Sequence, residues 1–174
     1  MKYFLSVILF FSIQTEWFKN TEKSILNIDR NVKLISEFEK IDKDGKTIIK
    51  KYKTEKEAKT VIQYKYGESM NIDISFYENR SQLFAEITKG KTGLIYKRKR
   101  QKNEPYAVLL ESRTYFKDKT QGIKKYREIK VYENSNIEKL KITLESTAFE
   151  IKKIGEKEFQ DLKEKYNRIN NWKE

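Results

Sequence analysis

The chain lacks cysteine and histidine altogether, and it contains a single proline and six glycines. Without cysteine it can form no disulfide and carry no lipid on a thiol. Without histidine or cysteine it cannot build the Ser-His and Cys-His pairs of many hydrolases or the usual zinc sites. No glycine-rich phosphate loop is present. We therefore expect no cofactor and no metal, and any catalysis would depend on carboxylates.

Charged and aromatic residues dominate what the 174 residues do contain. Charged residues make up 37% of the chain, and the excess of Lys and Arg gives a formal net charge of +12. The 11 tyrosines, 10 phenylalanines and 2 tryptophans each bury a large apolar area. This composition indicates one folded domain with a lean core, rather than a disordered chain or two domains.

The N-terminal segment has the pattern of a secretory signal peptide. Lys2 is followed by residues 3–13, which carry no charge, and the first acidic residue is Glu16. This apolar run is shorter than the roughly 20 residues of a spanning helix. We therefore expect a signal peptide over residues 1–15 and no stable transmembrane helix. The expected location is periplasmic or secreted, and an N-terminal membrane anchor is the alternative.

A single domain is expected over residues 16–174. Its first part, residues 16–31, is predicted as a short helix or an extended lead-in, with Thr21 as a candidate N-cap. From residue 32 onward, short segments of alternating apolar and polar residues predict a mainly β fold, an antiparallel meander curved into a half-barrel or barrel-like sheet. The expected strands are residues 32–39, 47–53, 62–66, 70–77, 83–87, 94–101, 106–117, 123–133, 137–146 and 149–154.

The pattern changes after Gly155. Phe159, Leu162, Tyr166 and Ile169 recur every three or four residues. This spacing places them on one face of a helix. The sequence therefore predicts a C-terminal α-helix over about residues 156–168, packed on the sheet.

A run of basic residues occupies the second half of the expected strand over residues 94–101 and extends one residue beyond it. Five of the seven residues 96–102 are Lys or Arg. Because unpaired charges are costly to bury, this segment is expected at an edge or in a projecting hairpin, with Lys97 opposite Glu111. Such a run either protects an edge from aggregation or binds an anion. The candidate anion-binding residues are Tyr96, Lys97, Arg98, Lys99, Arg100 and Lys102.

We expect a non-catalytic binding protein whose partner is anionic, namely a lipid, a glycan or an acidic protein. One alternative is a carboxylate-based hydrolase, although strand carboxylates of this kind are expected to face solvent beside lysines. The carboxylates considered are Glu86, Glu111, Glu128 and Glu145. The other alternative is a nucleic-acid-binding protein that is not exported. A basic, tyrosine-rich surface would suit it, but no nucleic-acid-binding signature is present, so nucleic acid is not the expected partner.

Export predicts a new N-terminus. Sequencing the N-terminus of the protein purified from its native host should show a start between about residues 12 and 20, because cleavage follows the apolar run. Cytoplasmic protein that retains Met1 would contradict this expectation.

Overall fold

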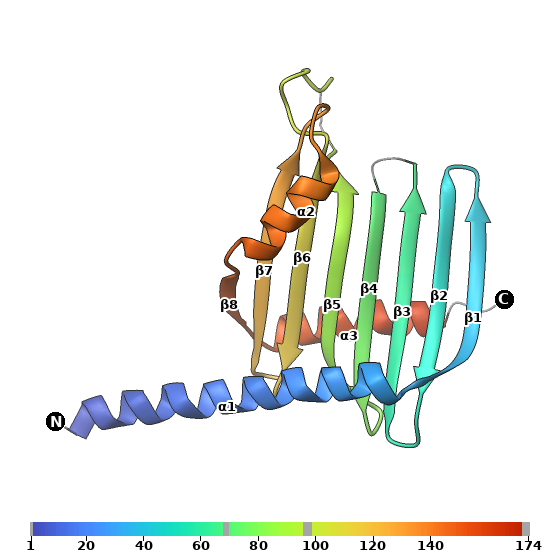
Figure 1. Cartoon of the computed structure of the whole chain (residues 1–174). Helices are drawn as coiled ribbons and strands as arrows, with labels where there is room; N and C mark the ends of the chain where they lie inside the picture. The colour runs from blue at the N-terminus through green and yellow to red at the C-terminus, as the bar shows by residue number, and fades with distance from the viewer. Residues whose placement is uncertain (1, 68–69, 96–98, 172–174) are drawn as a thin grey trace.

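The computed structural model describes residues 2–67, 70–95 and 99–171, with side chains described from residue 16 onward. Its strands form one antiparallel sheet in sequence order, and helices lie on both faces (Figure 1). The strands are β1 (Lys33–Asp42), β2 (Gly45–Lys53), β3 (Glu57–Tyr66), β4 (Met70–Asn79), β5 (Gln82–Gly93), β6 (Ala107–Phe116), β7 (Gly122–Val131) and β8 (Glu150–Ile154). The helices are α1 (Lys2–Asn31), α2 (Ile137–Ser146) and α3 (Glu156–Asn170).

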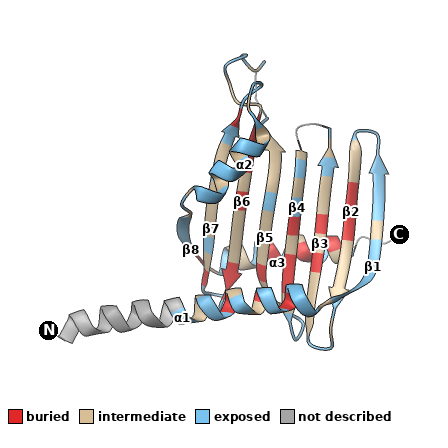
Figure 2. Ribbon diagram, viewed as in Figure 1, coloured by how far each residue is buried: buried red, intermediate tan, exposed pale blue. Residues whose placement is uncertain are grey.

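The predicted fold class is confirmed. The chain is mainly β, the sheet is an antiparallel meander, and α3 covers the helix predicted near the C-terminus. The sheet is open, because among the described residues β1 pairs only with β2 and β8 only with β7. Figure 2 shows β1 exposed along most of its length, whereas β2, β3 and β4 carry buried residues.

Both faces of the sheet are buried near one end. Phe76 and Tyr77 are consecutive residues of β4, so their side chains point to opposite faces, and both are buried. Tyr77 packs against α1 and Phe76 against α3. Figure 1 shows these two helices crossing the strands on opposite faces, near the end that holds the β4–β5 and β6–β7 turns.

α1 is much longer than the short helix predicted over residues 16–31. Thr21 is an interior residue rather than an N-cap, and its hydroxyl donates to the carbonyl oxygen of Trp17 at 3.0 Å. Ile25 and Ile28 are buried against the sheet, next to Tyr115. Among the residues that the structure describes, none of the helices combines the length and the apolar character needed to cross a bilayer.

α2 corrects the prediction of a strand over residues 137–146. Its apolar residues Ile137, Leu140 and Leu144 follow a helical spacing and pack over β6 and β7. The side chain of Asn136 caps the helix by accepting from the backbone N–H of Lys139 at 3.1 Å. The same segment also shows partial alternation, and the N-cap and the packing decide in favour of a helix.

Leu162 anchors α3 in the core. It is buried with Tyr166 and Ile169 against Ile62 and Ile74. Replacing it with alanine should lower the free energy of unfolding by about 2 to 5 kcal/mol, because a cavity would remain where its side chain packs. Urea unfolding followed by circular dichroism measures the change.

The matched control is Glu164→Ala, at an exposed position of the same helix. It should change stability by less than about 0.5 kcal/mol. Equal effects of the two substitutions would show that α3 does not dock on the sheet.

Candidate functional site

A groove opens at the end of the sheet that α1 and α3 cross. It lies between α3 and the two turns that join β4 to β5 and β6 to β7, and its volume is about 760 Å³. Small-molecule sites commonly occupy about 300–1,000 Å³. The apolar side chains that line it are Leu83, Phe84, Phe116, Phe159 and Tyr166.

An irregularity in the β4–β5 hairpin shapes this groove. Tyr77 pairs with Ala85 and Glu78 with Leu83, so Phe84 is an extra residue without a partner on β4. Such a β-bulge bends its strand and redirects side chains. The β5–β6 pairing also begins only at Ala85. Phe84 therefore precedes the first β5–β6 pair and has no partner on either neighbouring strand.

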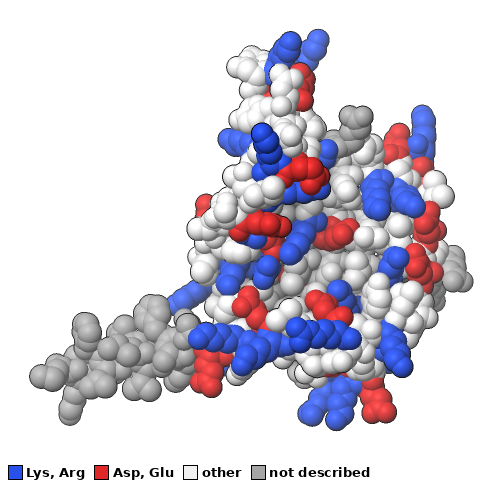
Figure 3. Space-filling model, in the orientation of Figure 1, with Lys and Arg blue, Asp and Glu red and all other residues white. Residues whose placement is uncertain are grey.

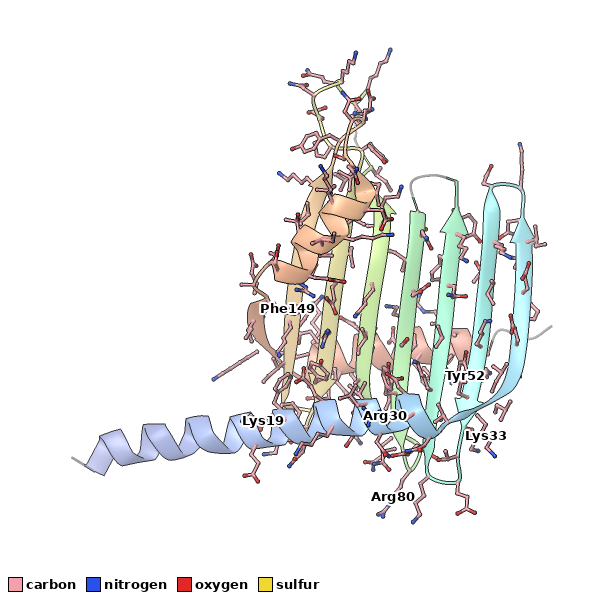
Figure 4. The ribbon with its side chains drawn as sticks, in the orientation of Figure 1. Lys19, Arg30, Lys33, Tyr52, Arg80 and Phe149 are labelled. Carbon is pink, nitrogen blue, oxygen red and sulfur yellow. The ribbon has the colours of Figure 1, made fainter. Side chains whose placement is uncertain are left out.

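The turn of this hairpin is conformationally strained. Arg80 and Ser81 have φ values of 49° and 65°, which side chains other than glycine seldom adopt. The Arg80 backbone N–H donates to the carbonyl oxygen of Lys56 at 2.6 Å and joins this turn to the β2–β3 connection. Figure 4 shows Arg80 at the tip of the turn, at the end of the sheet beside α1.

A second hollow lies under α1 and meets the groove. It has a volume of about 1,230 Å³ and is lined by residues of α1, the β2–β3 connection and the β4–β5 turn. Gln82, Phe84 and Phe116 line both spaces. The two hollows therefore adjoin at these three side chains, with α1 lining the second hollow and α3 lining the groove.

The groove combines an aromatic wall with a basic rim. Phe116 and Phe159 pack edge to face with their centroids 5.0 Å apart. Lys117, Lys119 and Lys163 line the rim and are exposed. An anionic group on an apolar ligand would meet complementary charge here.

Two carboxylates at the groove already have internal partners. Asp118 accepts hydrogen bonds from the backbone of Thr120 and Gln121 at 2.8 and 2.9 Å, and the first of these lowers the pKa of Asp118. Glu78 accepts from the hydroxyl of Tyr166. Burial, and then this carboxylate, raise the pKa of Tyr166 to about 12, so it remains a neutral donor. Both acids therefore serve the local structure.

Among the side chains that the structure describes, Glu111 is the only acidic one that is buried, and it departs from the solvent-facing position predicted for it. It is 4% exposed on the face of the sheet between α1 and α2. Its carboxylate binds Lys89 at 3.0 Å, Arg113 at 2.7 Å, and Arg127. Arg127 also donates to the carbonyl oxygen of Glu145 in α2 at 2.7 Å. The buried carboxylate thus orients the arginine that holds the end of α2.

Phe149 completes this charged cluster. The guanidinium of Arg127 lies 4.2 Å from the centroid of its ring, and that of Arg113 lies 5.4 Å away. Figure 4 shows Phe149 on the face of the sheet that carries α1 and α2, between these two helices. Both arginines that bind Glu111 therefore have further neighbours that hold them in place, which favours a structural role for the cluster.

The described residues of the strand predicted over 94–101 do not form a strand. β5 ends at Gly93, and Leu94, Ile95 and residues 99–101 lie outside any strand. Glu111 pairs with Lys89, which contradicts the expected pairing with Lys97. The reason is that β5 is long enough to supply its own partner for Glu111 before the basic run begins.

The structure places only part of the candidate anion-binding set. Tyr96, Lys97 and Arg98 lie outside the described residues. Arg100 binds the carboxylate of Glu133 and donates to the carbonyl oxygen of Glu104 at 2.7 Å. Lys99 and Lys102 are exposed. Anion binding by this run stays a prediction, and Arg100 already has protein partners.

The carboxylates considered for hydrolysis do not form one site among the described residues. Glu86 and Glu111 point to opposite faces of the sheet, because their partners Thr114 and Lys89 do so. Glu145 lies in α2 rather than in a strand. No cluster of three or more acidic side chains suited to a metal occurs in the described part of the chain.

Sequence reasoning missed the groove because its walls come from distant segments. One signal was present: Leu83, Phe84 and Ala85 are three consecutive apolar residues, which breaks the alternation of a regular strand. That break indicates a bulge. The position of Phe159 and Lys163 beside it follows only from the packing of α3.

No family model matches the chain, no curated protein matches it, and no solved structure matches its fold. Function must therefore be argued from the site.

The Glu111 cluster predicts a specific pH dependence. Burial alone would raise the pKa of Glu111, but hydrogen bonds from Arg127, Lys89 and Arg113 outweigh it and lower the pKa to about 2. Because the folded pKa is below the unfolded value of 4.5, this group stabilises the fold at neutral pH. The contribution is about 3 kcal/mol, at about 1.4 kcal/mol per pKa unit, and is lost as the pH falls toward 2.

The variant Glu111→Gln should therefore be less stable than the wild type at pH 7, by about 3 to 5 kcal/mol, since it leaves cations without their partner. The difference should shrink between pH 5 and about pH 2 as the wild-type carboxylate gains a proton. Urea unfolding at several pH values measures it. Glu128→Gln, at an exposed position of β7, is the control, and a difference independent of pH would contradict the assignment.

Proposed function

We propose that the protein is an exported, non-catalytic binding protein that holds a single-chain anionic amphiphile, a fatty acid, in the groove between α3 and the β4–β5 and β6–β7 turns. The observation that carries this proposal is the pairing of an aromatic and aliphatic wall with three rim lysines in one groove. The apolar wall would hold the chain, and the rim would face the carboxylate.

Charge complementarity favours an anionic ligand over a neutral one. Of the acidic groups at the groove, Glu78 is bound by Tyr166 and Asp118 by its own turn. Lys117, Lys119 and Lys163 are exposed at the rim. A carboxylate headgroup can therefore approach ammonium groups while its chain contacts Phe116 and Phe159.

The adjacency of the two hollows favours a long ligand. A chain that passes Phe84 and Phe116 would extend from the side of α3 toward the side of α1. An apolar chain in this position would cover few polar groups, because the residues that the two hollows share are two phenylalanines and one glutamine. A compact polar ligand such as a sugar would gain little from this lining.

The proposal predicts that oleate binds more tightly than oleyl alcohol, which has the same chain without the charge. Isothermal titration calorimetry with both compounds measures the difference. Replacing Lys117, Lys119 and Lys163 together with glutamine should weaken oleate binding about tenfold, at about 0.5 kcal/mol for each exposed pair. Binding of oleyl alcohol should not change.

A second variant and a charge control complete the experiment. Leu83→Ser should weaken binding of both compounds, because it removes apolar wall, and its melting temperature shows whether it is folded. Replacing three exposed lysines at the other end of the sheet, Lys43, Lys130 and Lys139, removes the same charge and should leave binding intact. Absence of saturable oleate binding by the wild type refutes the proposal.

A further inference from the structure

The acidic and the basic side chains of α1 point in different directions. Glu22 points inward, where it accepts from the hydroxyl of Tyr115 at 3.3 Å and lies 3.6 Å from the ammonium of Lys125. Asp29 binds the ammonium of Lys59 at 2.7 Å and the hydroxyl of Tyr77 at 3.2 Å. The acidic residues in the middle and at the end of the docked helix are therefore bound by the sheet.

The basic residues of the same helix face outward. Lys19, Lys23 and Arg30 are exposed, and they are spaced four and seven residues apart. At 3.6 residues per turn this spacing places them along one line of the helix surface. Leu26 lies on the same line and is 55% exposed. We call Lys19, Lys23, Leu26 and Arg30 the outer stripe of α1.

The outer stripe continues into the sheet. Lys33, the first residue of β1, is exposed directly after the helix. Figure 4 shows Lys19, Arg30 and Lys33 following one another along α1 and into β1, and Figure 3 shows Lys and Arg side chains along the outer surface of the helix. Glu16, an exposed acidic residue, lies three residues before the stripe begins. The line from residue 19 to residue 33 is thus basic, with one apolar side chain in its middle.

We infer that the outer stripe of α1 docks on the surface of an anionic lipid bilayer, with the helix lying parallel to that surface. A helix that presents basic residues around an exposed leucine matches this surface, because cations meet lipid phosphates while the apolar side chain enters the headgroup region. The sheet binds the inner face of α1, so the outer face is free for this contact. This inference stands apart from the proposed function.

The docking places the groove near the lipid. The hollow under α1 is lined by Trp17, Asn20, Thr21 and Ser24 of the same helix. A bilayer against the outer stripe would therefore lie beside the wall of a hollow that adjoins the groove. A ligand that leaves or enters the bilayer would have a short path to Phe84.

Vesicle co-sedimentation tests the inference. The probes are vesicles of phosphatidylcholine mixed with phosphatidylserine and vesicles of phosphatidylcholine alone. The wild type should bind the mixed vesicles. The triple variant Lys19→Gln, Lys23→Gln, Arg30→Gln should bind them about 100-fold more weakly, at about 1 kcal/mol per basic residue near an anionic surface. Its melting temperature should not change, because all three side chains are exposed.

The control separates a specific face from the general positive charge of the chain. The variant Lys43→Gln, Lys130→Gln, Lys139→Gln carries the same net charge and should keep most of the binding. Equal losses in the two triple variants would overturn the inference, as would binding to heparin or RNA but not to mixed vesicles. Oleate binding by the outer-stripe variant should match the wild type, so failure here is distinguishable from failure of the groove.

Discussion

The fold depends on the burial of both faces of a single sheet at one end. Phe76 and Tyr77 follow one another on β4 and point in opposite directions, and both are buried. No second sheet covers either face in the described part of the chain, so each face needs a helix. α1 supplies the cover for one face and α3 for the other. The groove beside α3 and the hollow under α1 both lie at this end.

A lean core makes polar contacts between helix and sheet important. The hydroxyls of Tyr77 and Tyr115 donate hydrogen bonds to Asp29 and Glu22 of α1. Burial is the main reason that the pKa of both tyrosines is raised, and the two carboxylates raise it further. Both tyrosines are therefore neutral donors. These bonds draw the acidic residues of α1 toward the sheet. A chain with a formal net charge of +12 thereby binds part of its acidic minority to the sheet, and its basic majority is left on the outside.

Most of the sheet could be predicted from alternation, since Met70, Ile72, Ile74 and Phe76 read directly as one face of a strand. α3 could also be predicted, because its apolar residues recur every three or four positions. α2 was not, because Ile137, Leu140 and Leu144 fit a helix while Leu140, Ile142 and Leu144 fit a strand. The Asn136 cap that favours the helix is local, three residues from Lys139. The contact that holds the end of α2, from Arg127 to the carbonyl oxygen of Glu145, instead joins residues that are distant in sequence. The groove escaped prediction for the same reason.

Irregular pairing, rather than the regular sheet, makes room for a ligand. A regular meander places each side chain against a partner on the next strand. Here Phe84 has no partner on β4 and lies beyond the first β5–β6 pair. Its ring lines two spaces at once, one below each covering helix. The bulge therefore places one aromatic ring between two hollows, because the helices that cover Phe76 and Tyr77 each line one of the spaces that Phe84 borders.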